Sequence, residues 1–477
     1  MAPEIEGFID TYVQALYDQN AAVFAGAGLS IPAGMIDWRQ LMRGIAKDIR
    51  LDVEKEHDLI TLAQFHVNEQ GGRHRINQTL ISEFAERAGQ TDNHRILASL
   101  PIRTFWTTNY DTLIEDALRS AHKRVDVKVS VENLATTLPR REAVVYKMHG
   151  DVSRPDEAVV TKDDYEAYNT IRQLFSTALQ GDLVSKTFLF IGFSFNDPNL
   201  GYILSRIRVL LGKNRRDHYC LFRRVQRADF DSAKEFNYAR ARQDLQVRDL
   251  RRYGIIGLLV DTYDQYTEIL RRIHRKYRMS RVFIGGSATS YAPWDEAEAQ
   301  NLIQELSRKL LKQGFGIVSG FGLGVGAHVV NGVVEQLDAE GTRVLDDRIV
   351  LRPFPYAISD ADERRRKWTA YREDMLDHAG IAIFLFGNKD ARGGCVIADG
   401  MIQEFDIAVQ KGIAVIPVGC TGSGAAELHG RVLADFNSYF PSRRGYKTLI
   451  EDLAKPGSAA NVVVRIMRVV TKLRTDA

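Results

Sequence analysis

The stretch Ala21-Ala-Val-Phe-Ala25-Gly26-Ala27-Gly28-Leu29-Ser30 decides the fold of the first half of the chain. Residues 21–25 form a short apolar run, which predicts a buried strand. Gly26-Ala27-Gly28 follow at once, and glycines without Cβ atoms let the backbone approach a pyrophosphate at the start of a helix. Tight strand-to-helix turns need glycine for structural reasons too, so this turn alone indicates a fold and leaves ligand binding open.

Further short runs rich in β-branched and aromatic residues recur along the first half, separated by stretches with helical periodicity. This alternation predicts βαβ units and therefore a parallel, Rossmann-type sheet. A basic helical stretch over residues 266–279 ends the unit. The runs predicted to be strands are 103–108, 144–148, 187–193 and 255–260.

A second cycle of the same kind begins at Arg281. Val282-Phe-Ile284 predicts a strand, Gly285-Gly286-Ser287 predicts a glycine-rich turn, and a helix follows to about residue 313. Strands at 315–318, 381–386 and 414–418 complete a smaller open α/β sheet. We therefore predict two α/β domains, 1–280 and 281–477, each with a glycine-rich turn after its first strand.

Charge and apolar patterning exclude several classes of partner. The 64 basic and 61 acidic side chains leave a net charge of only +3, which gives no global field for holding nucleic acid. The arginine-rich stretch 206–281 is interrupted by acidic residues, so we interpret it as a solvated face or a subunit interface. The apolar runs are too short to span a membrane, and Met1 to Phe8 show no targeting pattern, so we expect a cytoplasmic protein.

The three cysteines, Cys220, Cys395 and Cys420, are widely spaced and form no Cys-x-x-Cys pair. This pattern supports neither a disulfide framework nor a structural zinc site, so we expect no bound metal.

Four motifs in the first domain follow one another in the order found in sirtuins. The segment from Gly26 to Arg39 resembles the sirtuin signature GAGIS followed by AGIPDFR, and Thr107-Thr-Asn109-Tyr-Asp111 resembles TQNID. His149-Gly150 resembles the sirtuin HG pair. Finally, the segment from Phe190 to Asn199 resembles the GxS segment, in the form found in Sir2-like defence proteins of bacteria.

The residue types in these motifs suit cleavage of the bond between nicotinamide and ribose in NAD⁺. That reaction passes through an oxocarbenium-like ribosyl group, so the site must hold NAD⁺, shelter the cation and orient a nucleophile. Asn109 would bind the ribose hydroxyls or the attacking water. His149 would be the general base, because an imidazole suits proton transfer near neutral pH.

The resemblance also implies which residues contact NAD⁺. Asp111 would seat the nicotinamide carboxamide, and the GxS segment would hold the adenosine end. The residues implied in NAD⁺ binding are Gly26, Ala27, Gly28, Ser30, Asp37, Asp111, Gly192, Ser194, Asn196 and Asp197.

The sequence departs from deacylating sirtuins at two places. Those enzymes carry a zinc module with two Cys-x-x-Cys pairs after the HG motif, whereas here His149-Gly-Asp-Val-Ser-Arg-Pro155 continues without a cysteine. The module that frames the acyl-lysine channel is missing or replaced, which leaves water as the simplest acceptor. In addition, Ile36 stands where the signature has proline.

The second domain carries two glycine-rich turns within a short distance, Gly285-Gly286-Ser287 and the run from Gly320 to Gly326. Phosphates are the expected occupants of such turns. Arg372 and Lys389 would add cations for a pyrophosphate, and Glu404 a carboxylate for ribose hydroxyls.

This arrangement resembles the SLOG domain, a relative of the LOG phosphoribohydrolases. Gly400 and Glu404 echo part of the LOG motif PGGxGTxxE, but the PGG element is absent, and Ala391-Arg-Gly-Gly-Cys395 lies in its neighbourhood. We therefore expect this domain to sense a nucleotide without hydrolysing it.

A Sir2-like domain followed by a SLOG domain is similar, over essentially the whole chain, to the effectors of the Thoeris antiphage system. The resemblance implies NAD⁺ depletion, switched on by a cyclic ADP-ribose isomer that a TIR-domain partner protein makes. It also implies a homo-oligomer, tetrameric or filamentous. The implied activator pocket consists of Gly285, Gly286, Ser287, Leu323, Arg372, Lys389, Gly400 and Glu404.

Three other functions remain open on the sequence. The chain is an NAD-dependent protein deacylase if an acyl-lysine channel is built without zinc. It is a non-catalytic nucleotide sensor if Asn109 and His149 do not act. It is a Sir2-type effector with another trigger if the second domain responds to a protein or a nucleic acid.

Overall fold

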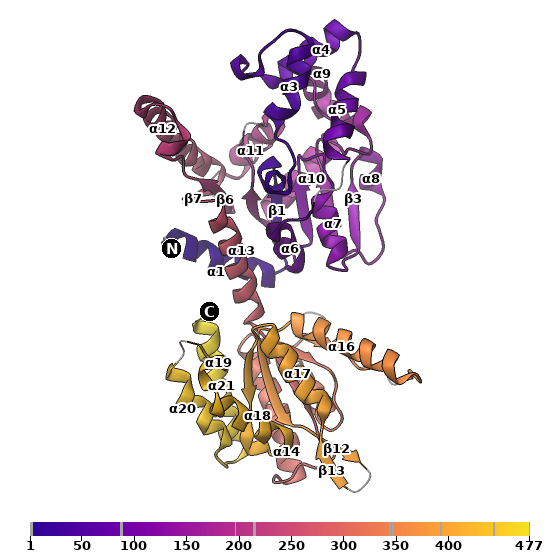
Figure 1. Cartoon of the computed structure of the whole chain (residues 1–477), viewed down its shortest axis with the longest axis vertical. Coiled ribbons are helices and arrows are strands. Elements are labelled where there is room, and N and C mark those ends of the chain that lie inside the picture. The colour runs from indigo at the N-terminus through magenta and orange to yellow at the C-terminus, as the bar shows by residue number, and fades with distance from the viewer. Residues whose placement is uncertain are drawn as a thin grey trace. The chain divides into compact units, whose positions relative to one another are not determined.

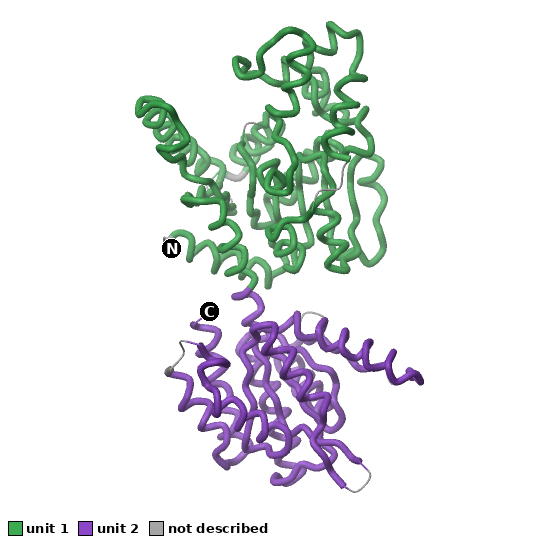
Figure 2. The backbone as a smooth tube through the Cα atoms, viewed as in Figure 1, with its two compact units in different colours: residues 1–274 green, residues 275–477 purple. Residues whose placement is uncertain are grey.

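The computed structural model describes residues 3–476 apart from 86–88, 196, 213–215, 343–344, 346–347, 356, 392–393 and 442–443. Contacts within the chain divide it into two compact units, residues 1–274 and 275–477 (Figure 2). The confirmed fold class is α/β, with one parallel sheet in each unit. The two units are described separately below.

The first unit is built on a seven-stranded parallel sheet with the order β3-β4-β2-β1-β5-β6-β7 (Figure 1). The central strand β1 is buried along its whole length and pairs with β2 on one side and β5 on the other. The strands are β1 (Ala21–Ala25), β2 (Thr104–Thr107), β3 (Val125–Lys128), β4 (Ala143–Lys147), β5 (Thr187–Ile191), β6 (His218–Arg223) and β7 (Ile255–Val260).

Helices connect these strands. Several of them, such as α3, α9 and α12, begin with a capping box, in which an N-cap side chain and the third helical residue satisfy each other's backbone N–H groups. The helices are α1 (Pro3–Tyr17), α2 (Ala27–Ser30), α3 (Trp38–Asp48), α4 (Leu59–Gln70), α5 (His74–Phe84), α6 (Asp92–Ser99), α7 (Leu113–Ser120), α8 (Val131–Ala135), α9 (Lys162–Ile171), α10 (Gln173–Ser185), α11 (Pro198–Leu211), α12 (Ala233–Leu250) and α13 (Asp264–Arg278).

The second unit has a five-stranded parallel sheet, β10-β9-β8-β11-β14, and a separate antiparallel hairpin, β12-β13. The strands are β8 (Arg281–Ser287), β9 (Gly316–Ser319), β10 (Ile349–Leu351), β11 (Ile381–Phe386), β12 (Asn388–Ala391), β13 (Gly394–Ile397) and β14 (Ala414–Pro417). The helices are α14 (Glu296–Lys312), α15 (Gly326–Ala339), α16 (Ala361–Asp377), α17 (Asp399–Gln410), α18 (Ser423–Ala434), α19 (Phe436–Tyr439), α20 (Lys447–Glu451) and α21 (Ala459–Thr475).

The predicted strands are present in both sheets, with some differences at their ends. The sequence analysis missed β3, β6, β10 and the hairpin β12-β13; β3 and β10 are only four and three residues long, and β6 is flanked by polar residues. It was wrong about Gly285-Gly286-Ser287, which belong to β8 and pair with Phe384, Leu385 and Phe386 of β11. The strand continues through these residues because the neighbouring backbone supplies the hydrogen bonds of a parallel ladder.

Each sheet has one position where the chain order reverses. In the first unit the reversal lies at β1: the chain first adds β2 on one side of β1 and later returns to add β5 on the other side. In the second unit the reversal lies at β8, which has β9 on one side and β11 on the other. In open parallel sheets, ligands bind at the carboxyl ends of the strands beside this reversal. The glycine-rich segments of both units lie at these ends.

The glycines of the first unit allow two loops to pack backbone against backbone. The N–H of Gly28 donates to the carbonyl of Gly192 at 2.9 Å. A Cβ on Gly26 would lie 2.4 Å from that carbonyl oxygen, and a Cβ on Gly192 would lie 2.2 Å from the nitrogen of Leu29. The close packing of the two loops therefore requires glycine at these positions, as the approach of a phosphate also would.

We predict that Gly192→Ala destabilises the first unit by about 2–4 kcal/mol. Gly192 has a φ of +66°, and the added methyl group would collide with backbone, which cannot move aside as a side chain can. Thermal and denaturant unfolding of the full chain measure the effect.

Gly181→Ala is the matched control, because its Cβ would meet nothing within 4 Å. Gly181 lies inside α10, so alanine is expected to stabilise the chain by up to about 1 kcal/mol. Equal unfolding midpoints for Gly192→Ala and the unmodified chain would contradict the packing argument.

Candidate active site

A cavity of about 990 Å³ lies at the carboxyl ends of β1, β2, β4 and β5. Every described residue predicted for NAD⁺ binding or catalysis lines it, and Asn196 lies outside the described residues. The predicted residues in its wall are Gly26, Ala27, Gly28, Ser30, Asp37, Asn109, Asp111, His149, Gly192, Ser194 and Asp197. The four motifs, far apart in sequence, therefore converge on one cavity.

Asn109 is fixed by the glycine-rich loop. Its Nδ2 donates to the carbonyl of Gly26 and to Oγ of Ser30, both at 3.1 Å, and its backbone N–H donates to Oγ1 of Thr107 at 2.9 Å. Because both hydrogens of Nδ2 are engaged, Oδ1 is the side-chain atom that can accept a hydrogen bond from a hydroxyl group or a water molecule.

His149 follows β4 and is almost fully buried, with 4% of its surface exposed. Its Nε2 lies 3.1 Å from Oδ2 of Asp197, within ion-pair distance although not aligned as a hydrogen bond. The rings of Tyr165 and Tyr168 meet the imidazole edge to face, with centroids 5.5 and 6.2 Å away. The ring is thus held on several sides by residues of α9 and α11.

Asp197 begins α11 as its N-cap, and its Oδ1 accepts the N–H of Leu200 at 2.9 Å. Burial opposes a charge on this carboxylate. The neighbouring His149 and the N–H groups of Leu200 and Asn199 outweigh that effect, so the pKa of Asp197 lies below its ordinary value.

Lys147, which precedes Met148 and His149, is fully buried and joins the loop that carries Asn109 to the segment that follows His149. Its ammonium group donates to the carbonyls of Tyr110 and Asp111 in the loop that carries Asn109. It also forms ion pairs with Asp151 and, at 3.0 Å, with Glu115. Burial acts against the ammonium charge, but these carboxylates outweigh it and raise the pKa of Lys147.

The sequence analysis missed several cavity residues. Arg39, which lay inside the quoted signature, donates to the carbonyls of Val53 and Glu56. His57, Lys162 and Tyr165 come from segments without a motif, so no sequence signal identified them. Asp37 lies in the cavity wall, yet its carboxylate caps α3 by accepting the N–H of Gln40 at 2.7 Å.

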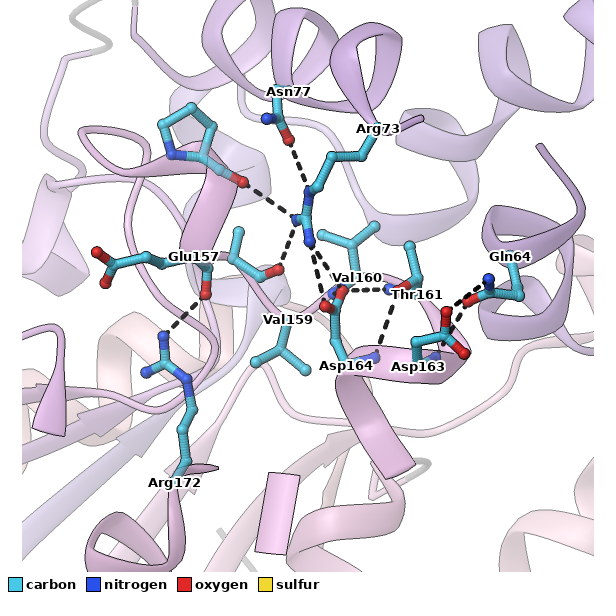
Figure 3. Close-up of polar contacts among 12 residues, drawn as sticks. Gln64, Arg73, Asn77, Glu157, Val159, Val160, Thr161, Asp163, Asp164 and Arg172 are labelled. Atoms are coloured by element: carbon cyan, nitrogen blue, oxygen red, sulfur yellow. Dashed lines mark hydrogen bonds and ion pairs between the residues drawn. The ribbon is translucent and has the colours of Figure 1, made fainter. Parts of the chain in front are cut away.

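The segment that follows His149, residues 150–161, is held by two arginines (Figure 3). Arg73 donates to the carbonyls of Pro155 and Ala158, at 3.2 and 2.7 Å, and pairs with Asp164 at 3.1 Å. Arg172 donates to the carbonyl of Glu157 at 2.8 Å. These contacts fix the backbone of the segment.

The glycines of the second unit repeat the packing seen in the first. The N–H of Ala288, just after β8, donates to the carbonyl of Leu323 at 2.8 Å. A Cβ on Gly322 would lie 2.1 Å from the carbonyl oxygen of Gly286. The loop 320–326 therefore lies directly against the end of β8.

Four of the residues predicted for the activator pocket meet at one point. Nε of Arg372 (α16) lies 3.7 Å from Oε1 of Glu404 (α17). A Cβ on Gly285 would lie 3.2 Å from Oε2 of Glu404, and one on Gly400 would lie 2.7 Å from Nη2 of Arg372. Burial raises the pKa of Glu404 to about 7, although Arg372 acts in the opposite direction.

The other predicted pocket residues have different surroundings. Ser287 donates to the carbonyl of Asn388 at 2.9 Å. Leu323 is 68% exposed, and Lys389 forms an ion pair with Asp399, the residue before Gly400. Arg372 also stacks over Phe354, with 4.8 Å from the guanidinium carbon to the ring centroid, a contact that no motif indicated.

The part of the chain that the structure describes contains neither a clustered metal site nor a helix that could span a membrane. No group of three or more His, Cys, Asp or Glu side chains there is arranged to hold a metal ion. No helix in that part of the chain has the length and apolar character needed to cross a membrane.

Comparison with known proteins identifies the family. The NAD(+) hydrolase ThsA of Bacillus cereus is 47% identical over 442 residues, which cover 92% of each chain. The NAD(+) hydrolase ThsA of Acinetobacter baumannii is 44% identical over 459 residues, covering 94% of this chain and 95% of that protein. The chain belongs to the ThsA family.

Two domain families and one further relative agree with membership of the ThsA family. Residues 103–244 match the SIR2-like domain, and residues 265–473 match the Sir2- and TIR-associating SLOG family. Defense-associated sirtuin 2 of Bacillus subtilis is 26% identical over 196 residues, which are 39% of this chain and 19% of that protein.

We predict that Arg73→Lys loosens the segment 150–161 and destabilises the first unit by about 1–3 kcal/mol. A lysine keeps the charge, but its single nitrogen cannot replace the three guanidinium nitrogens, which together donate to Asn77, Asp164 and the carbonyls of Pro155 and Ala158. Unfolding midpoints and the rate of cleavage by a protease specific for acidic residues, which can cut at Asp156 or Glu157, measure the effect.

Arg154→Lys is the control in the same segment. Arg154 forms an exposed pair with Glu157 and is expected to change stability by less than about 0.5 kcal/mol. If both variants were cleaved at the rate of the unmodified chain, Arg73 would not hold the segment.

Proposed function

We propose that this chain is an NAD⁺ glycohydrolase that converts NAD⁺ and water into nicotinamide and ADP-ribose. The observation that carries the proposal is the convergence of Asn109 and His149 on one cavity with the glycine-rich loop. Membership of a family whose members are named NAD(+) hydrolases supports the same reaction.

The reaction follows from the geometry of the two side chains. NAD⁺ lies in the cavity with its pyrophosphate near the loop 26–30 and its nicotinamide ring near Asp111. Nicotinamide leaves as a neutral molecule when its bond to ribose breaks, so it needs no proton from an acid. Water then adds to the oxocarbenium-like carbon; Oδ1 of Asn109 accepts one of its hydrogen bonds, and the imidazole of His149 takes its proton.

Water is the acceptor that this cavity favours over an acyl-lysine peptide. The segment 150–161 is tied down by Arg73 and Arg172 where deacylating sirtuins carry their zinc module (Figure 3). With this segment held in place, we propose that the site admits water and excludes a peptide, so that hydrolysis is preferred over deacylation.

The second unit is proposed to sense a nucleotide and to control the first. In this proposal residues 1–280 hydrolyse NAD⁺ and residues 281–477 bind a cyclic ADP-ribose isomer made by a TIR-domain partner, in a homotetramer or a filament. Arg372 would bind its pyrophosphate and Glu404 its ribose hydroxyls. The description of the matched family as Sir2- and TIR-associating supports such a partner.

Antiphage defence is the proposed biological role. Depletion of NAD⁺ would stop the metabolism of an infected cell, and a nucleotide trigger would keep the enzyme inactive before infection. The name of the relative defense-associated sirtuin 2 supports this role.

We expect purified protein to release nicotinamide from NAD⁺, faster in the presence of a cyclic ADP-ribose isomer. Asn109→Ala and His149→Ala should each lower the turnover number by about 10²–10⁴-fold, because they remove the group that orients water and the general base. Chromatography of nicotinamide and ADP-ribose measures the reaction. Turnover that persists in both variants would overturn the catalytic assignment, and transfer of an acetyl group from peptide to ADP-ribose would favour a deacylase.

Arg372→Ala is expected to abolish activation by the cyclic nucleotide and to leave the basal rate unchanged. The same change removes a cation from the proposed pyrophosphate site, so calorimetry of the full chain should show at least about tenfold weaker binding. Arg308→Ala is the control in the same unit, because Arg308 forms a half-exposed pair with Glu305. Full activation of Arg372→Ala would count against the pocket.

A further inference from the structure

Asp197 and His149 form a buried acid–imidazole pair whose acid comes from outside the HG motif. The carboxylate oxygen Oδ2 lies 3.1 Å from Nε2 of His149, and both side chains are less than 10% exposed. Tyr165 donates its hydroxyl hydrogen to the same Oδ2 at 3.4 Å. The sequence analysis treated Asp197 only as an NAD⁺ contact.

The position of Asp197 is set by the start of α11. Its other oxygen, Oδ1, accepts the N–H of Leu200 as the N-cap of that helix. The two carboxylate oxygens therefore have different tasks: Oδ1 fixes the side chain to the helix, and Oδ2 faces the imidazole. A carboxylate at this place makes the tautomer of His149 with hydrogen on Nε2 the favourable one, and leaves Nδ1 to accept a proton.

We propose that Asp197 is a positioning residue for the hydrolysis of NAD⁺: it holds His149 in the tautomer with hydrogen on Nε2 and stabilises the imidazolium formed when Nδ1 takes the proton from water. The predicted change in turnover number rests on the proposed function. The predicted tautomer of His149 does not, because it is a property of the protein without substrate. The proton balance is simple, because water loses one proton to Nδ1 and the carboxylate stays ionised throughout.

Among the described groups around the imidazole of His149, Asp197 is the carboxylate that pairs with it. Tyr165 and Tyr168 of α9 present ring edges to the imidazole, and burial keeps the pKa of Tyr165 well above its ordinary value, so its hydroxyl remains a donor. Lys162 and Glu166 of α9 and Asp111 after β2 line the same cavity, and for these residues the structure gives no ion pair or hydrogen bond with the imidazole.

Asp197→Asn separates the two tasks of this side chain. Asparagine caps helices as well as aspartate does, so α11 keeps its N-cap. Because the N–H of Leu200 requires an oxygen acceptor, the amide oxygen takes the place of Oδ1 and the NH₂ group takes the place of Oδ2. That NH₂ group then donates to Nε2 of His149, which forces the hydrogen onto Nδ1 and blocks the base.

The test uses the full chain labelled with ¹⁵N-histidine, with the His149 signals assigned by their loss in His149→Gln. We expect neutral His149 to carry its hydrogen on Nε2 in the unmodified chain and on Nδ1 in Asp197→Asn. We also expect the turnover number of Asp197→Asn to fall about 10²–10⁴-fold, while KM for NAD⁺ changes by less than about threefold.

Asp295→Asn is the matched control, since Asp295 is the N-cap of α14 in the second unit and makes the same kind of backbone contact. It should leave the turnover number within about twofold. Tyr165→Phe keeps the ring edge against His149 but loses the hydroxyl, and should lower the turnover number about fivefold.

Three results would overturn the inference. The first is a hydrogen on Nδ1 of neutral His149 in the unmodified chain, which does not depend on any variant. The second is an unchanged tautomer in folded Asp197→Asn. The third is a loss confined to KM, which would make Asp197 a contact for NAD⁺ alone. If the unmodified chain released no nicotinamide, the proposed function would fail, and the tautomer spectra would still decide the role of Asp197.

Discussion

The contact between the loop after β1 and the loop after β5 shapes the cavity of the first unit. At this contact backbone touches backbone, because a Cβ at Gly26, Gly28 or Gly192 would collide with the opposite loop. The contact places the amide of Asn109 against the carbonyl of Gly26, and it places the start of α11, with Asp197, beside His149. The second unit has the same kind of contact between backbones, where loop 320–326 packs against the end of β8.

Buried charges connect the parts of the cavity that the glycine contact does not reach. Lys147 holds the loop that carries Asn109 through two carbonyls and the segment after His149 through Asp151. Removing a charge from water is costly, so such a group is tolerated only where its hydrogen-bonding capacity is used by partners. The loops that carry Asn109 and His149 are therefore joined by a lysine that does not line the cavity wall.

The segment after His149 is held through its backbone. Arg73 and Arg172 tie backbone carbonyls of residues 155–158 to α5 and the end of α9 (Figure 3). Arginine suits this task, because its planar guanidinium group donates in several directions at once. Hydrogen bonds from these two arginines thus order the loop that follows His149.

The sequence by itself determined the two parallel sheets, most of their strands and the four motifs of the first cavity, because short apolar strands and glycine-rich turns leave local patterns. It did not determine the strands β3 and β6, or the continuation of β8 through Gly285-Gly286-Ser287, where pairing with β11 decides the conformation. Only the tertiary structure brought Asp197 to His149, Arg73 to residues 155–158 and Arg372 to Phe354. These contacts join residues from different elements, and no local pattern of residue types records which side chains a fold will bring together.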